Sequence, residues 1–468
     1  MDLGAAIAAN PQSFENARYN EGFELSRAVR QDAQLAALQM RFNNLKERLP
    51  ALAKVASEQG VSSIDSLDDA VPLLFPHTVY KSYPLSFLEQ GRFDRLTKWL
   101  GSLTTVDVSK VDLSAIDTID GWIGALEKTG LAPIHTFGTS GKLSIIPRTK
   151  VQLRVTVQIN ARCIRDFHGV GSGPDLLTQP MPLIAPSYRY GASSIARGMN
   201  LMADLYGKGE ALFLYPDAYF SADVASLAGR LRAAEARGEA GQLELPASLI
   251  ARRAEFAARE AQRGQDMDRF FDEATQRYAG RDVFLFAVWP ILFEWAEEGL
   301  KRGIKNVFGP NSVLTTGGGS KGRVLPADYK HQIFEFLGFE RHMEFFGMSE
   351  LMANAPRCEH NCFHFTPVVI PFVLDPETGQ SLPREGKQTG RLALMDLLPD
   401  SYWGGFVTGD RVTMGGFDAP CECGRTGPYL EADIQRFSDL KNGDDKINCA
   451  GAPEAHDRAV EFLLDRTS

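Results

Sequence analysis

A short turn near residue 140 concentrates the residue types that bind phosphate. The segment Thr136-Phe-Gly-Thr-Ser-Gly-Lys142 combines two glycines, several hydroxyl side chains and a lysine. Glycines let the backbone approach an anion, and successive N–H groups, hydroxyls and a lysine can then surround its oxygens. The Walker A pattern does not fit, because only two residues separate Gly138 from Gly141 and Leu143 follows the lysine. We therefore predict a phosphate loop of another class, with a plain turn as the alternative.

Four further motifs follow this turn in order along the chain. They are Thr315-Thr-Gly-Gly-Gly-Ser320, Phe346-Gly-Met-Ser-Glu350, Thr408-Gly-Asp410 and the single Arg436. Together with the turn, this series resembles the adenylate-forming superfamily of acyl-CoA synthetases, in which corresponding motifs occur in the same sequence. Each motif is common by chance, so the resemblance depends on all five being in register.

Two segments near the C-terminus narrow the resemblance. They are Cys421-Glu-Cys-Gly-Arg-Thr-Gly-Pro428 and Gly443-Asp-Asp-Lys-Ile-Asn-Cys-Ala-Gly451. On these the chain is most similar to phenylacetate–CoA ligases and to the acyl-protein synthetases of bacterial bioluminescence. The resemblance implies ATP-dependent activation of a small carboxylic acid to an acyl-adenylate with release of pyrophosphate. Acyl transfer to a thiol would follow, on CoA, a carrier protein or a protein cysteine.

Two other functions stay open at this point. The first is a stand-alone adenylase that passes the acyl-AMP to an amine or a hydroxyl in a biosynthetic pathway. The second is a catalytically silent binding subunit. The intact phosphate loop, Glu350 and Asp410 disfavour the silent subunit.

The resemblance implies a nucleotide-binding role for each matching residue. The residues that would contact the phosphates of ATP are Thr136, Gly138, Thr139, Ser140, Gly141 and Lys142. The residues that would hold the nucleoside are Gly317, Gly318, Gly319, Phe346, Gly347, Asp410 and Arg436. The glycines offer adenine a flat wall, Phe346 would stack on it, and Asp410 would accept hydrogen bonds from the ribose.

The remaining implied roles concern the reacting groups. Ser349 would contact the α-phosphate region, and Glu350 would bind Mg²⁺, since a hard cation on phosphates takes carboxylates and waters. Lys142, Glu350 and Lys446 are the catalytic candidates. Many relatives carry a second lysine two residues after Lys142, and Lys142 itself or Arg148 would supply that charge here. Tyr188, Tyr190 and Phe345 are expected to line the acid pocket, with a role as core aromatics as the alternative.

Cysteine and histidine residues form a second constellation. Cys358 and His364 lie six residues apart, and Cys421 and Cys423 form a C-x-C pair. Two such pairs separated by a long loop suit a tetrahedral structural zinc site, and several relatives carry a matching arrangement. The nearby Cys362 and His360 could replace either member of the first pair, and buried free thiols are the simpler alternative.

The C-terminus is shorter than the resemblance implies. Residues 1–435 would form the adenylation domain, with a helical insertion at about 221–278, and residues 436–468 would be a hinge and the remnant of a lid domain. That lid is either naturally short or truncated. Cys449 lies in this segment, where it is a candidate acyl acceptor or an ordinary loop residue.

Hydrophobic periodicity predicts the elements that carry these motifs. Apolar residues at helical spacing predict helices within 12–60, and the segment 221–278 reads as two or three solvent-facing helices. Buried strands are expected at 282–288 and 312–316, while 151–157 fits a strand or a helix. Strands alternating with helices indicate an α/β fold, here a large adenylation domain with several sheets flanked by helices.

Composition excludes some partners. The 468 residues carry a formal net charge of −9, which disfavours nucleic acid as a partner. No apolar run reaches the length of a membrane span, and the start lacks the basic region of a signal peptide, so we expect a cytoplasmic protein without a membrane partner. A homodimer is compatible with these features.

Overall fold

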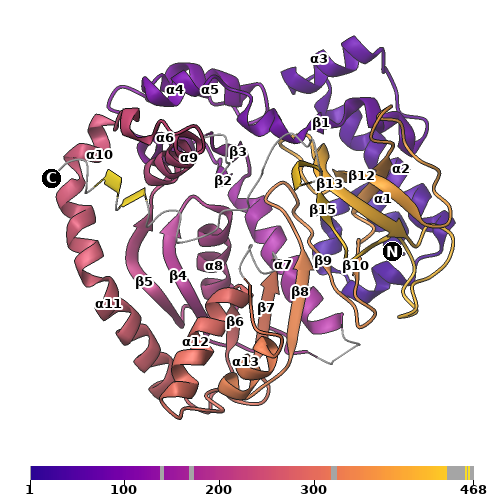
Figure 1. Ribbon diagram of the computed structural model, residues 1–468. Coiled ribbons are helices and arrows are strands. Elements are labelled where there is room, and N and C mark those ends of the chain that lie inside the picture. The colour runs from indigo at the N-terminus through magenta and orange to yellow at the C-terminus, as the bar shows by residue number, and fades with distance from the viewer. Residues whose placement is uncertain are drawn as a thin grey trace.

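The computed structural model describes residues 2–136, 142–167, 173–317, 324–439, 459–460 and 462–463. Within them the chain is a mixed α/β protein whose two large sheets are flanked by helices (Figure 1). This confirms the predicted fold class. In the described part of the chain, no helix combines the length and apolar character needed to cross a membrane.

The first large sheet carries the motifs around residues 315 and 346. It has six strands in the order β5-β4-β6-β7-β8-β9. The bounds are β4 Leu183–Gly191, β5 Ala211–Phe220, β6 Phe284–Phe286, β7 Val313–Gly317, β8 His342–Phe346 and β9 Ala355–Pro356. All neighbours pair in parallel except β8 and β9, which are antiparallel. The predicted buried strands correspond to β6 and β7.

Helices cover both faces of this parallel sheet. They are α7 Lys150–Asp166, α8 Ser194–Leu205, α11 Arg253–Gln276, α12 Trp289–Lys301 and α13 Tyr329–Leu337. The ambiguous stretch 151–157 belongs to α7. The deciding local signal is a capping box, in which Gln152 N donates to Thr149 Oγ1 at 3.2 Å and the Gln152 side chain accepts from Thr149 N at 3.0 Å.

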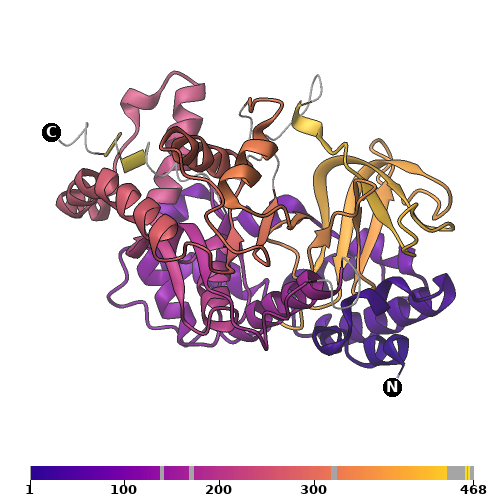
Figure 2. The same cartoon turned by 90° about the horizontal axis from the view of Figure 1, so that it is seen from below.

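The second large sheet carries the motifs around residues 408 and 436. It has seven strands: β1 Phe75–Pro76, β10 Cys362–His364, β11 Val369–Leu374, β12 Gln388–Asp396, β13 Gly405–Gly415, β14 Tyr429–Glu431 and β15 Gln435–Arg436. Only β1 pairs in parallel, against β13. Figure 2 shows the N-terminal helices beneath this sheet.

Three N-terminal helices lie here: α1 Leu3–Ala9, α2 Arg27–Leu45 and α3 Pro50–Gln59. Of these, α2 and α3 fall within the range 12–60 in which helices were predicted, whereas α1 precedes it. Leu38, Phe42 and Leu52 are fully buried in one apolar cluster with Phe372 and Trp403 of the second sheet region. The first and last thirds of the chain therefore share a core.

The segment 221–278, predicted as a helical insertion, contains three α-helices: α9 Ala222–Ala236, α10 Ala247–Ala251 and α11. The expectation that they all face solvent is wrong for α9, in which ten of 15 residues are buried. Its alanine, glycine and serine residues are small enough to pack closely. It meets α6 Ile119–Glu127, where Asp120 accepts from Ala222 N at 2.7 Å and Asp223 accepts from Ile119 N at 2.8 Å.

A smaller unit precedes α7. The helices α4 Leu85–Glu89 and α5 Phe93–Gly101 lie before α6, and the antiparallel pair β2 Ile134–Thr136 and β3 Ser144–Ile146 follows it. This hairpin flanks the predicted phosphate loop.

Candidate active site

The hairpin holds the two ends of the predicted phosphate loop. Thr136 pairs with Ser144 across β2 and β3. The Lys142 ammonium lies 5.9 Å from the centroid of the Tyr83 ring. Of the other predicted phosphate ligands, Gly138, Thr139, Ser140 and Gly141 lie outside the described residues.

Arg148 holds the segment around Glu350 through hydrogen bonds to its backbone. Its side chain is buried, and its guanidinium donates to the backbone oxygen of Ser349 at 2.7 Å and to that of Leu351. It also donates to Thr156 Oγ1 at 3.0 Å. The arginine considered above as a phosphate ligand is thus engaged with this backbone. It acts as a positioning residue.

Asp396 holds the same segment from the second sheet. Its buried carboxylate accepts from Met352 N at 2.6 Å and from Leu398 N at 2.9 Å. Burial raises the pKa of Asp396 to about 6, although these hydrogen bonds and Arg148 oppose the increase. Sequence reasoning missed the role of Asp396, since nothing local marks an aspartate at the end of β12 as a support for a distant loop.

Two predicted nucleoside ligands meet directly on the second sheet. Asp410 of β13 lies opposite Arg436 of β15, and Arg436 Nε lies 3.0 Å from Asp410 Oδ1. Burial raises the pKa of Asp410, while the charges of Arg436 and His77 lower it. The Thr408 hydroxyl is engaged within the sheet, where it donates to Leu392 O at 2.8 Å and accepts from Asp410 N at 3.0 Å.

Glu350 shares cationic neighbours with Asp410. Burial raises the pKa of Glu350, and the charges of Arg148, His77 and Arg436 lower it. Glu350, Asp410, Arg436 and His77, called the charged cluster below, therefore come together from four separate segments. His77 lies in the 3-10 helix His77–Lys81 and has no sequence motif that would have identified it.

A cavity of about 290 Å³ opens between the parallel sheet, α7 and α8. We call it the main cavity. Six of the predicted site residues line it: Thr136, Tyr188, Gly317, Phe345, Gly347 and Ser349. Three motifs, with lining residues from Thr136 to Ser349, thus border one space. Gly318 and Gly319 lie outside the described residues.

Comparison with known proteins bears on this arrangement. No protein-family model matches the chain, and no curated protein sequence does. Among solved structures, a 2-hydroxyisobutyryl-CoA ligase in the postadenylation state with R3-HIB-AMP matches with a TM-score of 0.51 at 16% identity, over 90% of this chain and 71% of that chain. The same ligase with 2-HIB-AMP and CoA, in the thioesterification state, gives 0.51 at 15% identity over the same shares.

This chain has the fold of the adenylate-forming ligases. The likeness extends over nine tenths of its length, so it includes both large sheets. At such low identity it concerns the fold, and the narrower resemblance to phenylacetate–CoA ligases and acyl-protein synthetases stays a prediction.

Within this adenylation fold, neighbouring aromatic residues occupy different places. Phe345 lines the main cavity, whereas the ring of Phe346 lies 6.1 Å from Phe363 and 6.3 Å from Phe365, on the side of β10. Its predicted stacking on adenine stays a prediction. A Cβ at Gly347 would collide with Oδ1 of Asn354, so a larger residue there would displace the Asn354 side chain.

Tyr188 and Tyr190 differ in the same way. Tyr188 is buried and lines the main cavity, but Tyr190 is 41% exposed, does not line it, and has the Arg189 guanidinium over its ring. The pairing of β4 with β5 is irregular between the two tyrosines, so they do not share one environment. Tyr190 therefore does not line this cavity, and its predicted role in the acid pocket stays a prediction.

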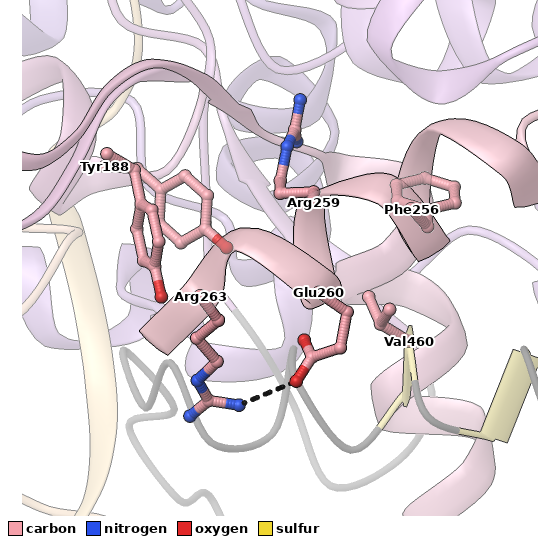
Figure 3. Close-up of a pocket in the computed structure, with 7 residues that line it drawn as sticks. Tyr188, Phe256, Arg259, Glu260, Arg263 and Val460 are labelled. Atoms are coloured by element: carbon pink, nitrogen blue, oxygen red, sulfur yellow. Dashed lines mark hydrogen bonds and ion pairs between the residues drawn. The ribbon is translucent and has the colours of Figure 1, made fainter. Parts of the chain in front are cut away.

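Tyr188 also borders a second, smaller pocket (Figure 3). Phe256, Glu260 and Arg263 reach it from α11, and Arg263 lies 3.5 Å from Glu260. Val460 approaches from the C-terminal segment and is buried in the same apolar cluster as Tyr188. Part of the C-terminal segment 436–468 thus packs in the same apolar cluster as Tyr188, which also lines the main cavity. Lys446 and Cys449 lie outside the described residues.

The four predicted zinc ligands come together beside the antiparallel sheet. Ligand atoms of Cys358, His364, Cys421 and Cys423 all lie within 4.8 Å of one another, and Cys423 Sγ is 3.4 Å from His364 Nε2. Cys358 follows β9, His364 ends β10, and the C-x-C pair lies between β13 and β14. The fold thus brings two distant sequence pairs into one group.

Both candidate replacements stand outside this group. Cys362 Sγ lies 3.5 Å from the backbone oxygen of His360, and the His360 ring lies 3.1 Å from the exposed Glu422.

The donor set fits Zn²⁺. Three thiols and one imidazole at these separations match the ligands of a closed tetrahedral site. Burial lowers the pKa of His364 to about 3, so its ring is neutral, as a metal ligand requires. Burial raises the pKa values of Cys358 and Cys421, while backbone hydrogen bonds from neighbouring residues favour their thiolates. The buried Nδ1 of His364 makes no hydrogen bond to any described residue.

Proposed function

We propose that this protein uses ATP to convert a carboxylic acid to an acyl-adenylate and then transfers the acyl group to a thiol of CoA or a carrier protein. The observation that carries the proposal is the convergence of segments from residue 77 to residue 436 on the main cavity and the adjacent charged cluster. The adenylation fold supports it, as do the acyl-AMP and CoA bound to the ligase in the solved structures.

The chemistry requires two anions to meet. An oxygen of the acid attacks the α-phosphorus, a new oxygen–phosphorus bond forms, and the bond to the β-phosphate oxygen breaks to release pyrophosphate. Catalysis is then mainly positioning and charge neutralisation. Mg²⁺ held by Glu350 would neutralise phosphate charge, Lys142 would bind the leaving pyrophosphate, and Asp410 with Arg436 would hold the ribose. Arg148 and Asp396 would keep the Glu350 segment in register.

Zn²⁺ would have a structural role. Held by Cys358, His364, Cys421 and Cys423, it would join the segment after β9 to the segment before β14. That connection links the parallel sheet, which borders the main cavity, to the sheet that carries Asp410.

The first test is ATP–pyrophosphate exchange over a panel of aryl and aliphatic acids. Exchange that depends on one class of acid supports adenylation. An absence of exchange with every acid would instead favour the silent binding subunit.

The acceptor is tested by a second set of assays. Adding CoA, carrier protein or amines to an acid that supports exchange separates thiol transfer from amide formation. Mass spectrometry of the wild type and of Cys449→Ser, incubated with acid and ATP, then detects or excludes a thioester on the chain itself.

A further inference from the structure

The main cavity has uncharged walls. Among the described residues that line it, none is an aspartate, glutamate, lysine or arginine. Its histidine, His135, is neutral, because burial lowers the pKa of the ring to about 3, helped by the charge of Arg197. That ring stacks on Phe220 with centroids 6.4 Å apart and planes 10° apart. A ligand group inside this space therefore meets aromatic faces and neutral polar atoms.

Two threonine side chains in the wall make no hydrogen bond to any described residue. Thr315, in the centre of β7, is 2% exposed, and its hydroxyl makes no hydrogen bond to any described residue. Thr316, also bordering the cavity, is 3% exposed and its hydroxyl is equally unpaired. A buried hydroxyl without a partner is unfavourable, so such groups are normally satisfied by protein, water or ligand.

The strand geometry directs Thr315 toward α7. Side chains alternate along a strand, so Thr315 shares a face with Val313, which is buried in the same apolar cluster as Ile164 of α7. Leu314 and Thr316 share the other face, and Leu314 is buried in the cluster under α12 and α13. Ile164 lines the main cavity, as does Asn160 one turn earlier.

We propose that the main cavity selects a carboxylic acid that has no charge other than its carboxylate and carries a hydroxyl group that hydrogen-bonds to Thr315. This rests on the proposed function and names the substrate class of the same site. An amino acid or a dicarboxylic acid is excluded, because its second charge would be buried without a counter-ion. An acid that lacks the hydroxyl fills the space but leaves Thr315 unpaired.

Such a site discriminates strongly. A site built to hydrogen-bond a substrate hydroxyl rejects the analogue that lacks it, because the buried protein group then has no partner. With one neutral hydroxyl pair, we expect about tenfold or more between matched acids.

The experiment uses matched pairs of acids, each with and without a hydroxyl, together with amino and dicarboxylic analogues. Two readouts are taken on the full chain: Kd of the acid alone by calorimetry, and kcat/KM in ATP–pyrophosphate exchange. Thr315→Val removes the hydroxyl and keeps the shape. Thr366→Val is the matched control, since Thr366 is also buried, its hydroxyl also lacks a hydrogen bond to any described residue, and it does not line the cavity.

We expect the hydroxylated acid of a pair to bind about tenfold more tightly, and Thr315→Val to abolish that preference while Thr366→Val retains it. Equal use of both members, or a preference that survives Thr315→Val, would overturn the inference, because ordered water would then satisfy the threonine. Selective binding without exchange by any acid would support this inference and contradict the proposed function. The two failures are therefore distinguishable.

Discussion

The main cavity and the charged cluster are adjacent, yet their chemistry is opposite. The cavity is lined by uncharged residues of the parallel sheet and its helices, while the cluster gathers Glu350, Asp410, Arg436 and His77 against the antiparallel sheet. In the proposed function, charge is concentrated where the phosphates would lie, and none of the described residues around the organic part of the acid is charged. This division would let one site neutralise a triphosphate without attracting charged acids to the main cavity.

The largest effect is expected from removing the carboxylate of Glu350, which tests whether the charged cluster is needed for activation. In Glu350→Gln we expect exchange to fall on the order of 10²–10³-fold, because a preorganised charged group is lost where phosphate charge develops. Affinity for the acid alone should stay within about twofold, since Glu350 does not line the main cavity. Glu340→Gln, at an exposed site on the loop before β8, is the control. Normal exchange in Glu350→Gln would show that the charged cluster has no role in activating the acid.

Removing the metal ligands tests the connection between the two sheets. Cys421→Ser together with Cys423→Ser should reduce zinc from about one ion per chain to almost none and destabilise the protein by several kcal/mol. Mass spectrometry of metal content and urea unfolding measure both. Cys362→Ser, outside the four-ligand group, should retain the ion. If the wild type were stable without metal, the four residues would be buried free thiols and an imidazole rather than a zinc site.

A substitution of Arg148 tests whether exchange depends on how the backbone around Glu350 is held in place. Arg148→Met removes the hydrogen bonds to the backbone of Ser349 and Leu351. We expect a loss of about 2–4 kcal/mol in the free energy of unfolding, and exchange lowered by about tenfold or more. The matched control is Arg154→Met on the exposed side of α7, with an expected change below about 0.5 kcal/mol. Equal stability of both variants would refute the positioning role.

The pH dependence of exchange should differ from that of acid binding, because carboxylates that titrate lie in the charged cluster and none lies among the described residues that line the main cavity. Burial raises the pKa of Glu350 above its usual 4.5 and that of Asp410 above 3.8. Cation and ribose binding need the ionised carboxylates, so kcat/KM for exchange should fall with decreasing pH from a midpoint above 4.5, about tenfold per unit below it. In Glu350→Gln the residual activity should follow a flatter curve. Over the same pH range, affinity for a hydroxylated acid with no charge besides its carboxylate should change little until that carboxylate is protonated.

The smallest effect concerns the two tyrosines of β4. Tyr190→Ala should leave the KM for the acid within about twofold, because the side chain is exposed and outside the main cavity. Tyr188→Ala should raise that KM more, since it opens the wall between the main cavity and the smaller pocket. If Tyr190→Ala raised the KM more than Tyr188→Ala, the acid would bind nearer to Tyr190 than to the main cavity.

The sequence alone determined the order of the motifs and the elements that carry them. Val313–Gly317 forms a strand because a run of apolar and β-branched residues precedes a glycine-rich segment. For 151–157 the periodicity left strand and helix open, and the local signal for a helix is the capping box of Thr149 and Gln152. The paired spacing of cysteines and a histidine likewise predicted the four-ligand group, because side-chain chemistry is local.

Only the tertiary structure decided which distant groups meet. Arg148 binds the backbone of the Glu350 segment, and His77 joins Glu350, although neither is marked by its neighbours in sequence. Tyr190 lies outside the main cavity, at an irregularity in the pairing of β4 with β5, and α9 is buried because its side chains are small. Such contacts depend on packing between segments far apart in the chain, which periodicity and motif spacing do not encode.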